Sequence, residues 1–400
     1  MAVQPVNITP ATSAAPAVLA LAFRPFFLLA GVWALASAAL WLGQLSGWWS
    51  VQLLLPASLW HAHEMLFGFG ALVAAGFLLT AAQNWTNVPA LRGTKLALLS
   101  LCWLAARFVP LFSYGQSSMV LLLGLQSLWW LGVLAAFSRQ LWLAKSRRNY
   151  QFIAILLVMM LLNLSFLLLA HADMPDYAAH LSHSMILMFC LLMGIVGARV
   201  IPFFTARATA TTQSSTPRLN KIVLFVSLPA TALFVSSGFY PPLFSPGYLM
   251  LLSALLHLLR LGLWFTPKLL KHPLLWSLHL SYLAMALGLM LMAISLLTGL
   301  LYFKDMLHLV AISAMAAMML SMMARVSLGH TGRPLLVSNL LALSFAAVLL
   351  SGVARTLAVL LAKPLLLWQL SGALWLVAFL IFIRVYLPIL TSPRLDGRPG

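Results

Sequence analysis

The sequence predicts an all-α polytopic membrane protein with about twelve transmembrane helices. The mean hydropathy is +1.03, and only 7% of the 400 residues are charged, which together exclude an ordinary soluble domain. Apolar runs of about 20 residues, the length that crosses a bilayer as a helix, recur along the whole chain. The interior is therefore expected to be a helix bundle set in a lipid bilayer.

Three regions are expected in order. Residues 1–20 are polar, rich in Ala and Pro and lack the basic segment that opens a signal peptide, so they predict a flexible cytoplasmic lead. Residues 21–390 form the transmembrane domain, and residues 391–400 form a short cytoplasmic tail. The twelve spans are expected at residues 25–43, 59–82, 94–112, 118–142, 152–170, 180–204, 220–239, 247–265, 274–300, 306–328, 335–361 and 366–390.

The net charge of +18 is distributed as a topology signal. Loops after odd-numbered spans carry few basic residues, Lys304 and Lys363, whereas most lysines and arginines follow even-numbered spans. The positive-inside rule then places both termini in the cytoplasm, as an even number of spans also requires. The chain has no aromatic-interleaved basic patch, so no nucleic-acid partner is expected.

An internal repeat is indicated at the ends of spans six and ten. The pattern R-V-x-x-x-x-T-x-R occurs at residues 199–207 and again at 325–333, an offset of 126 residues. Spans two, six and ten each open near a histidine. These observations predict three four-helix units of parallel topology, with binding sites at their interfaces. Chance similarity between apolar segments is the alternative.

Histidines are the most informative residues, because ionisable groups at membrane depth are costly and usually functional. Neutral imidazole is also the commonest metal ligand in proteins. Five histidines open spans that start on the outer side of the membrane, and we expect this outer group to bind a cofactor. It consists of His61, His63, His180, His183 and His308.

The spacing within this outer group limits what each histidine can do. His180 and His183 share a helix face, whereas His61 and His63 are rotated by about 200° and can bind one metal only if the helix is irregular there. Packing or a proton path are alternative uses of these imidazoles. Cys102 and Cys190 lie inside spans and form no disulfide framework.

A second, inner group of histidines lies near the cytoplasmic face. His330 follows His308 by 22 residues, about 33 Å along a helix, so one metal cannot use both. His279 and His257 also lie on the cytoplasmic half. Including this inner side, the metal ligands are expected among His61, His63, His183, His308, His279 and His330.

Intramembrane arginines need partners, because guanidinium stays charged. Arg107 and Arg355 lie near the outer ends of spans three and eleven, 248 residues apart. Glu64 is expected to be the only acid well placed within the bundle. We therefore expect Arg107 and Arg355 to neutralise an anion at the outer face, either Glu64 or a cofactor carboxylate.

Several motifs make the chain resemble the NnrS family over residues 21–390. They are F-R-P-F-F at 23–27, W-H-A-H-E-M at 60–65 with G-F-L-L-T at 76–80 and N-W-T at 84–86, G-A-R-V-I-P-F-F-T at 197–205, and R-V-S-L-G-H-T-G-R at 325–333. The resemblance implies a multi-pass protein of the bacterial inner membrane that contains haem and copper. It also implies a link to denitrification and to nitric oxide stress resistance, with nitric oxide or iron-nitrosyl species as partners.

The residues themselves leave three functions open: a haem- and copper-binding protein with or without turnover, a transporter or channel using intramembrane His and Arg, and a non-catalytic haem or metal sensor or assembly factor. No C-x-x-C-H motif is present, which excludes covalent c-type haem. The haem that the family resemblance implies is therefore expected to be haem b. No Walker A sequence is present, which argues against ATP-driven transport by this chain alone.

Overall fold

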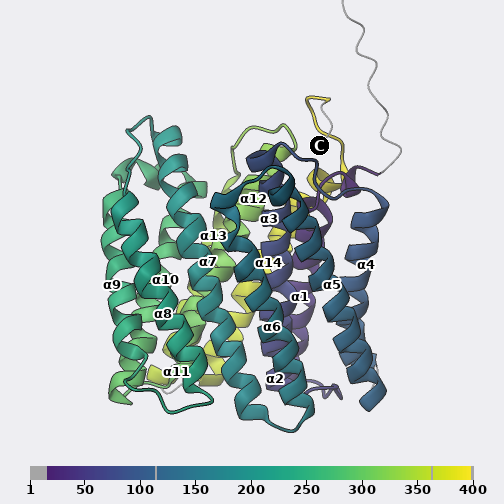
Figure 1. Ribbon diagram of the computed structural model, residues 1–400, viewed down its shortest axis with the longest axis vertical. Helices are drawn as coiled ribbons and strands as arrows, with labels where there is room; N and C mark the ends of the chain where they lie inside the picture. The colour runs from purple at the N-terminus through teal and green to yellow at the C-terminus, as the bar shows by residue number, and fades with distance from the viewer. Residues whose placement is uncertain (1–15, 113–114, 362–363, 398–400) are drawn as a thin grey trace, which may run out of the picture.

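The computed structural model describes residues 16–112, 115–361 and 364–397. This part of the chain is helical and contains no strand. It contains twelve helical segments long and apolar enough to cross a membrane, so the predicted fold class is confirmed. Figure 1 shows the helices standing side by side in one bundle. Of the predicted N-terminal lead, residues 1–15 lie outside the described residues, as do residues 398–400 of the tail.

Each expected span overlaps one helical segment along most of its length. Ten spans are built on single α-helices: α1 (Phe23–Leu45), α4 (Thr94–Phe112), α5 (Gln116–Leu143), α6 (Gln151–His171), α7 (Pro175–Thr209), α8 (Pro217–Ser237), α9 (Gly247–Trp264), α10 (Pro273–Thr298), α13 (Asn339–Leu360) and α14 (Pro364–Thr391). Short 3-10 turns are η1 (Ala17–Leu19), η3 (Arg147–Asn149) and η4 (Pro267–Lys271).

The second and tenth spans are each interrupted by a π-helix. The second consists of α2 (Ala57–His63), η2 (Glu64–Gly70) and α3 (Ala71–Thr86). The tenth consists of α11 (Phe303–His308), η5 (Leu309–Ala316) and α12 (Ala317–His330). Each π-helix starts directly after a histidine. Because π-helical turns occur mostly at functional sites, these two positions mark where to look for chemistry.

The bundle has two ends that differ in what they carry. At one end α3, α12 and α14 finish and both ends of the described chain lie (Figure 1). We call it the terminal end. At the other, the opposite end, α2 and α11 begin (Figure 1). The five histidines predicted as the outer group all belong to the halves of spans two, six and ten nearer the opposite end.

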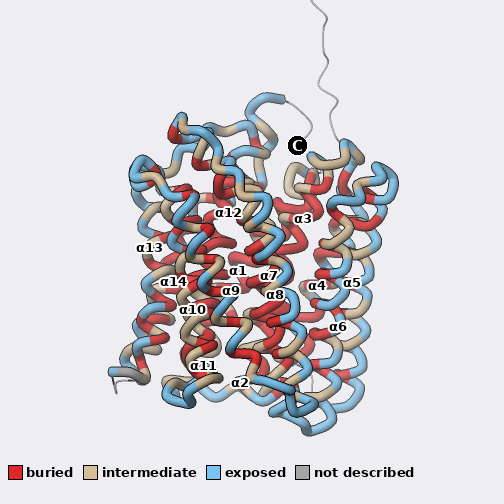
Figure 2. The backbone as a smooth tube through the Cα atoms, turned by 60° about the vertical axis from the view of Figure 1, so that its left-hand side comes forward, coloured by how far each residue is buried: buried red, intermediate tan, exposed pale blue. Residues whose placement is uncertain are grey.

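Spans two, six and ten form the centre of the bundle. In their most apolar windows 83%, 67% and 78% of residues are buried, against 28% to 61% in the other spans. The three also contact one another, since α2 and η5 both pack on α7 and α12 packs on α3. Figure 2 shows buried residues concentrated along this central line, with exposed residues on the outer helices. The spans that carry the histidines are therefore the innermost ones.

Two glycines allow the close approach of neighbouring helices to η5. A Cβ at Gly352 of α13 would lie 2.7 Å from the backbone nitrogen of Ser313, and one at Gly288 of α10 would lie 3.2 Å from that of Val310. Such separations are shorter than van der Waals contact, so only glycine fits at this distance. The π-helix that follows His308 is therefore closely packed on two sides, by α13 and by α10.

The internal repeat of three four-helix units stays a prediction.

Candidate functional site

Glu64, the first residue of η2, is a fully buried carboxylate with every oxygen in use. Its Oε2 accepts hydrogen bonds from Trp33 Nε1 at 2.7 Å and from Arg107 Nη1 at 2.8 Å. Its Oε1 lies 2.8 Å from Nδ1 of His63. Glu64 and Arg107 are both 0% exposed, so this is an ion pair without water screening. Nε and Nη2 of Arg107 are buried without a hydrogen-bond partner among the described residues.

His63 continues this network to the other side of span two. Its Nε2 lies 3.2 Å from Oδ1 of Asn163 and 3.4 Å from Nε2 of Gln126. Asn163 in turn donates through Nδ2 to Oε1 of Gln126 at 3.2 Å. The network therefore joins α1, span two, α4, α5 and α6 through buried polar groups. Both ring nitrogens of His63 are engaged, which holds the imidazole in one orientation.

Gly68 of η2 leaves the space in which the Glu64 pair sits. A Cβ at this position would lie 2.9 Å from Nη1 of Arg107, 3.1 Å from Oε2 of Glu64 and 3.3 Å from Nε1 of Trp33. All three of these atoms take part in hydrogen bonds to the carboxylate or belong to it. The glycine in the sequence E-M-L-F-G, four residues after Glu64, is therefore required by the ion pair and not by a turn.

His61 has different surroundings from His63. Its ring stacks on Trp41 with ring centres 4.6 Å apart and planes at 12°. Its Nδ1 is buried and has no hydrogen-bond partner among the described residues. A buried polar atom without a partner is uncommon and calls for an explanation. Although η2 begins just after these residues, the two imidazoles face separate sites.

His308, the last residue of α11, faces the same region as His61. Its Nδ1 lies 2.7 Å from the carbonyl oxygen of Lys304, an acceptor, so the proton is on Nδ1 and Nε2 keeps its lone pair. A backbone carbonyl that orients imidazole in this way is the usual support of a metal-binding histidine. His308 lies within electrostatic range of His61, His183 and Arg355. These four side chains, from spans two, six, ten and eleven, form what we call the opposite-end cluster.

Arg355 carries the charge of the opposite-end cluster, and its partner is Asp305. The Nη1 of Arg355 lies 2.9 Å from Oδ1 of Asp305, with side chains 17% and 10% exposed. The expectation that Glu64 is the only acid well placed within the bundle is therefore wrong. Asp305 directly precedes the expected span at residues 306–328, which predicts a loop position, but it lies in the first turn of α11 and is buried against α13. Arg107 therefore pairs with the carboxylate of Glu64, and Arg355 pairs with that of Asp305.

The other predicted histidines are not members of this cluster, although His180 lies within electrostatic range of His183. His180 Nε2 donates to the carbonyl of Phe234 at 2.9 Å and its ring stacks on that residue, which joins α7 to α8. His279 Nδ1 is 2.9 Å from the carbonyl of Leu275. His330 at the terminal end is 3.5 Å from Asn84. Among the residues that the structure describes, no group of three or more His, Cys, Asp or Glu side chains is arranged to hold a metal ion.

Sequence reasoning missed two kinds of residue. Gln126 and Asn163 are amides in the interior of long apolar spans, and their position there is the signal that could have identified them as members of the network. Arg260 of α9 is 1% exposed and belongs to the same class of intramembrane arginine as Arg107. It donates through Nη1 to Oδ1 of Asn220 at 3.2 Å and through Nη2 to the carbonyl of Gly194 at 3.0 Å.

The comparison with known families covers nearly the whole chain. The family model described as NnrS protein matches residues 17–394 of 400. The matched region includes both π-helices, the Glu64 network and the opposite-end cluster. No curated protein matches the chain. Because the family model spans far more than half of the sequence, the chain belongs to the NnrS family.

Proposed function

We propose that this protein binds haem b and copper in the bacterial inner membrane and serves in resistance to nitric oxide stress and in denitrification. The observation that carries the proposal is Nδ1 of His61, which is buried without a hydrogen-bond partner among the described residues, at the end of the bundle where His183 and His308 also lie. Membership in the NnrS family supports the same reading. Nitric oxide or iron-nitrosyl species are the partners we expect.

The residues of the opposite-end cluster fit a haem better than a closed copper site. Haem iron takes one or two axial ligands from the protein, and His61 and His308 each offer a nitrogen with a free lone pair. A copper site needs two to four imidazoles, and His183 is the third imidazole of the cluster. A bound haem would supply an iron to which nitric oxide can coordinate.

The protein's own residues prepare this region in three ways. Trp41 holds the His61 ring by stacking, which excludes water from one face. The Lys304 carbonyl holds the tautomer of His308. Arg355 places a positive charge nearby that could neutralise a ligand carboxylate, although Asp305 already offsets part of it. The Glu64 network holds span two against its neighbours. Of His61 and His63, it is His63 that belongs to this network.

Replacing the free histidines should remove the cofactor. We expect His61→Ala and His308→Ala proteins, purified in detergent, to lose most of the Soret absorbance and the haem extracted with pyridine, because each lacks an imidazole that would hold the haem. His272→Ala is the matched control, since His272 is exposed in the turn before α10. Full haem content in a His61→Ala/His308→Ala double variant would rule out these two histidines as ligands. A colourless, metal-free wild-type protein would favour a transporter instead.

The sidedness of the bundle is a second expected result. The basic loops predict that the terminal end faces the cytoplasm. After Gly400, a fused reporter that works only in the cytoplasm should therefore be active. At the exposed α6–α7 turn near Asp173, an inserted reporter that works only in the periplasm should be active. The opposite pattern would place the histidines of the opposite-end cluster on the cytoplasmic side and contradict the proposed orientation.

A further inference from the structure

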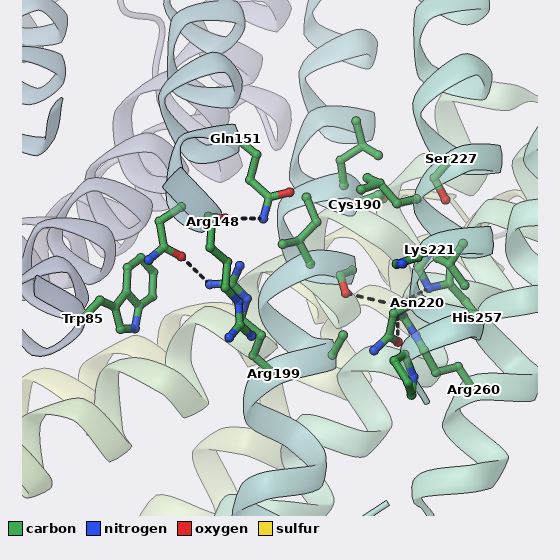
Figure 3. Close-up of a pocket in the computed structure, with 18 of the residues that line it drawn as sticks. Trp85, Arg148, Gln151, Cys190, Arg199, Asn220, Lys221, Ser227, His257 and Arg260 are labelled. Carbon is green, nitrogen blue, oxygen red and sulfur yellow. Dashed lines mark hydrogen bonds between the residues drawn. The ribbon is translucent and has the colours of Figure 1, made fainter. Parts of the chain in front are cut away.

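A large cavity lies at the terminal end, far from the opposite-end cluster. Its volume is about 830 Å³, within the range of sites that bind organic ligands. Its wall is built from the middle of α7, from the parts of α3, α8 and α9 nearer the terminal end, and from the connection between α5 and α6. Figure 3 shows the cationic side chains around it, with Arg148 and Arg199 on one side and Lys221 and Arg260 on the other. We call it the basic cavity.

The charge of the basic cavity is not balanced by the chain. The lining residues include Arg148, Arg199, Lys221 and Arg260 but no Asp or Glu. None of these four cations belongs to an ion pair within the described residues. At the other end of the bundle, by contrast, Arg107 has a carboxylate at 2.8 Å. An uncompensated Arg or Lys at membrane depth costs about 2.5–3.5 kcal/mol on insertion scales.

The hydrogen bonds of the two inner arginines are made to neutral groups. Arg199 Nη1 donates to Oδ1 of Asn149 at 2.7 Å and its guanidinium lies over the ring of Trp85. Arg260, besides its bonds to Asn220 and Gly194, also contacts the hydroxyl of Tyr282. Its Nε is buried without any partner among the described residues. These contacts orient the two guanidinium groups and leave N–H donors and positive charge available to an anionic ligand.

The cavity is amphipathic. Besides the cations, the lining includes the apolar side chains of Leu191 and Ile195 from α7 and of Val223 and Leu224 from α8. The wall thus combines basic groups that can grip an anionic head with an apolar surface that can cover a hydrocarbon part. Two arginines from different helices suit phosphate or carboxylate oxygens equally well in geometry. Four cations, however, match the double charge of phosphate groups better than single carboxylates.

We propose that the basic cavity binds a phosphate-bearing amphiphilic anion that enters from the terminal end. Two sources share this chemistry. One is the headgroup of an acidic phospholipid, because basic pockets between transmembrane helices on the cytoplasmic side bind such headgroups. The other is a soluble organic phosphate. The proposal does not depend on the cofactor at the opposite end.

The test measures the thermal stability of the purified full-length protein with defined probes. In the lipid arm, the protein is placed in nanodiscs of phosphatidylcholine with or without phosphatidylglycerol. In the soluble arm, inorganic pyrophosphate is added to protein in a non-ionic detergent. A ligand that binds only the folded state raises the midpoint of unfolding. A rise in the first arm identifies a lipid, and a rise in the second identifies a soluble phosphate.

Matched variants tie that rise to the cavity. Arg148→Gln/Lys221→Gln removes two exposed cations of the lining and should fold normally. We expect about 10- to 100-fold weaker binding of whichever probe stabilises the wild type, because charge-assisted hydrogen bonds are lost. Arg147→Gln is the control, since Arg147 is exposed in the same turn η3 but does not line the cavity. Arg260→Gln tests the buried cation as a second variant.

Three results would overturn the proposal. One is the absence of a stability increase with either probe. Another is an increase that persists unchanged in Arg148→Gln/Lys221→Gln, which would place the anion elsewhere. The third is loss of haem absorbance in that double variant while the His61→Ala variant keeps it, which would assign the cavity to the haem. In this last outcome the cofactor proposal fails as well, whereas the first two results overturn this proposal and leave the cofactor proposal standing.

Discussion

Glu64→Gln should destabilise the protein by roughly 3–5 kcal/mol, the cost of removing one partner from a buried ion pair. The substitution keeps the size of the side chain and removes only the charge. Arg107 then remains fully buried without a counter-charge, because the other groups at the site, Trp33 and His63, do not supply one. Chemical unfolding of the detergent-solubilised protein, followed by tryptophan fluorescence, measures the change in the free energy of unfolding.

A double-mutant cycle identifies the cause of that loss. Arg107→Gln alone should also be strongly destabilising, whereas Glu64→Gln/Arg107→Gln should lose less than the sum of the two, since no uncompensated charge remains. Asp305→Asn provides a graded comparison and should cost less, because its pair with Arg355 is partly exposed. Asp176→Asn, at an exposed position, is the control. Additive single effects would show that the pair is not coupled.

Gly352→Ala should have the second largest effect, a loss of about 1–3 kcal/mol from overpacking. The new Cβ would lie 2.7 Å from the backbone nitrogen of Ser313 in η5. A backbone atom inside a helix cannot move away as a side chain can, so α13 and η5 must separate. Arg355 lies one turn further along α13 and pairs with Asp305 of α11. The same substitution should therefore lower haem retention as well as the midpoint of unfolding.

Gly124→Ala is the matched control for this prediction. Gly124 lies in the interior of α5, and a Cβ there would meet no atom within 4 Å. Alanine should be neutral there or stabilising by about 0.5–1 kcal/mol, because glycine weakens a helix interior. If Gly352→Ala behaved like Gly124→Ala, the close packing of α13 on η5 would have no energetic consequence. The comparison is made on proteins purified in the same detergent.

The sequence by itself determined the helical class and the positions of the spans. Apolar runs of membrane length leave a helix as the one way to satisfy their backbone hydrogen bonds within a single segment. It also identified spans two, six and ten as the carriers of histidines, and it paired Arg107 with Glu64 as one of two options. These conclusions depend on local hydropathy and on the scarcity of acids, both of which can be counted along the chain.

Only the tertiary structure decided which helices are central and which polar groups meet. In a membrane, the helix faces that contact lipid and the faces that contact other helices are equally apolar. Hydropathy along the sequence therefore could not place spans two, six and ten at the centre of the bundle. The sequence also did not predict the π-helices after His63 and His308, and the second of these packs closely against Gly352 of α13. The pairing of Arg355 with Asp305 and the collection of cations around the basic cavity join residues distant in sequence, and only the arrangement of helices brings them together.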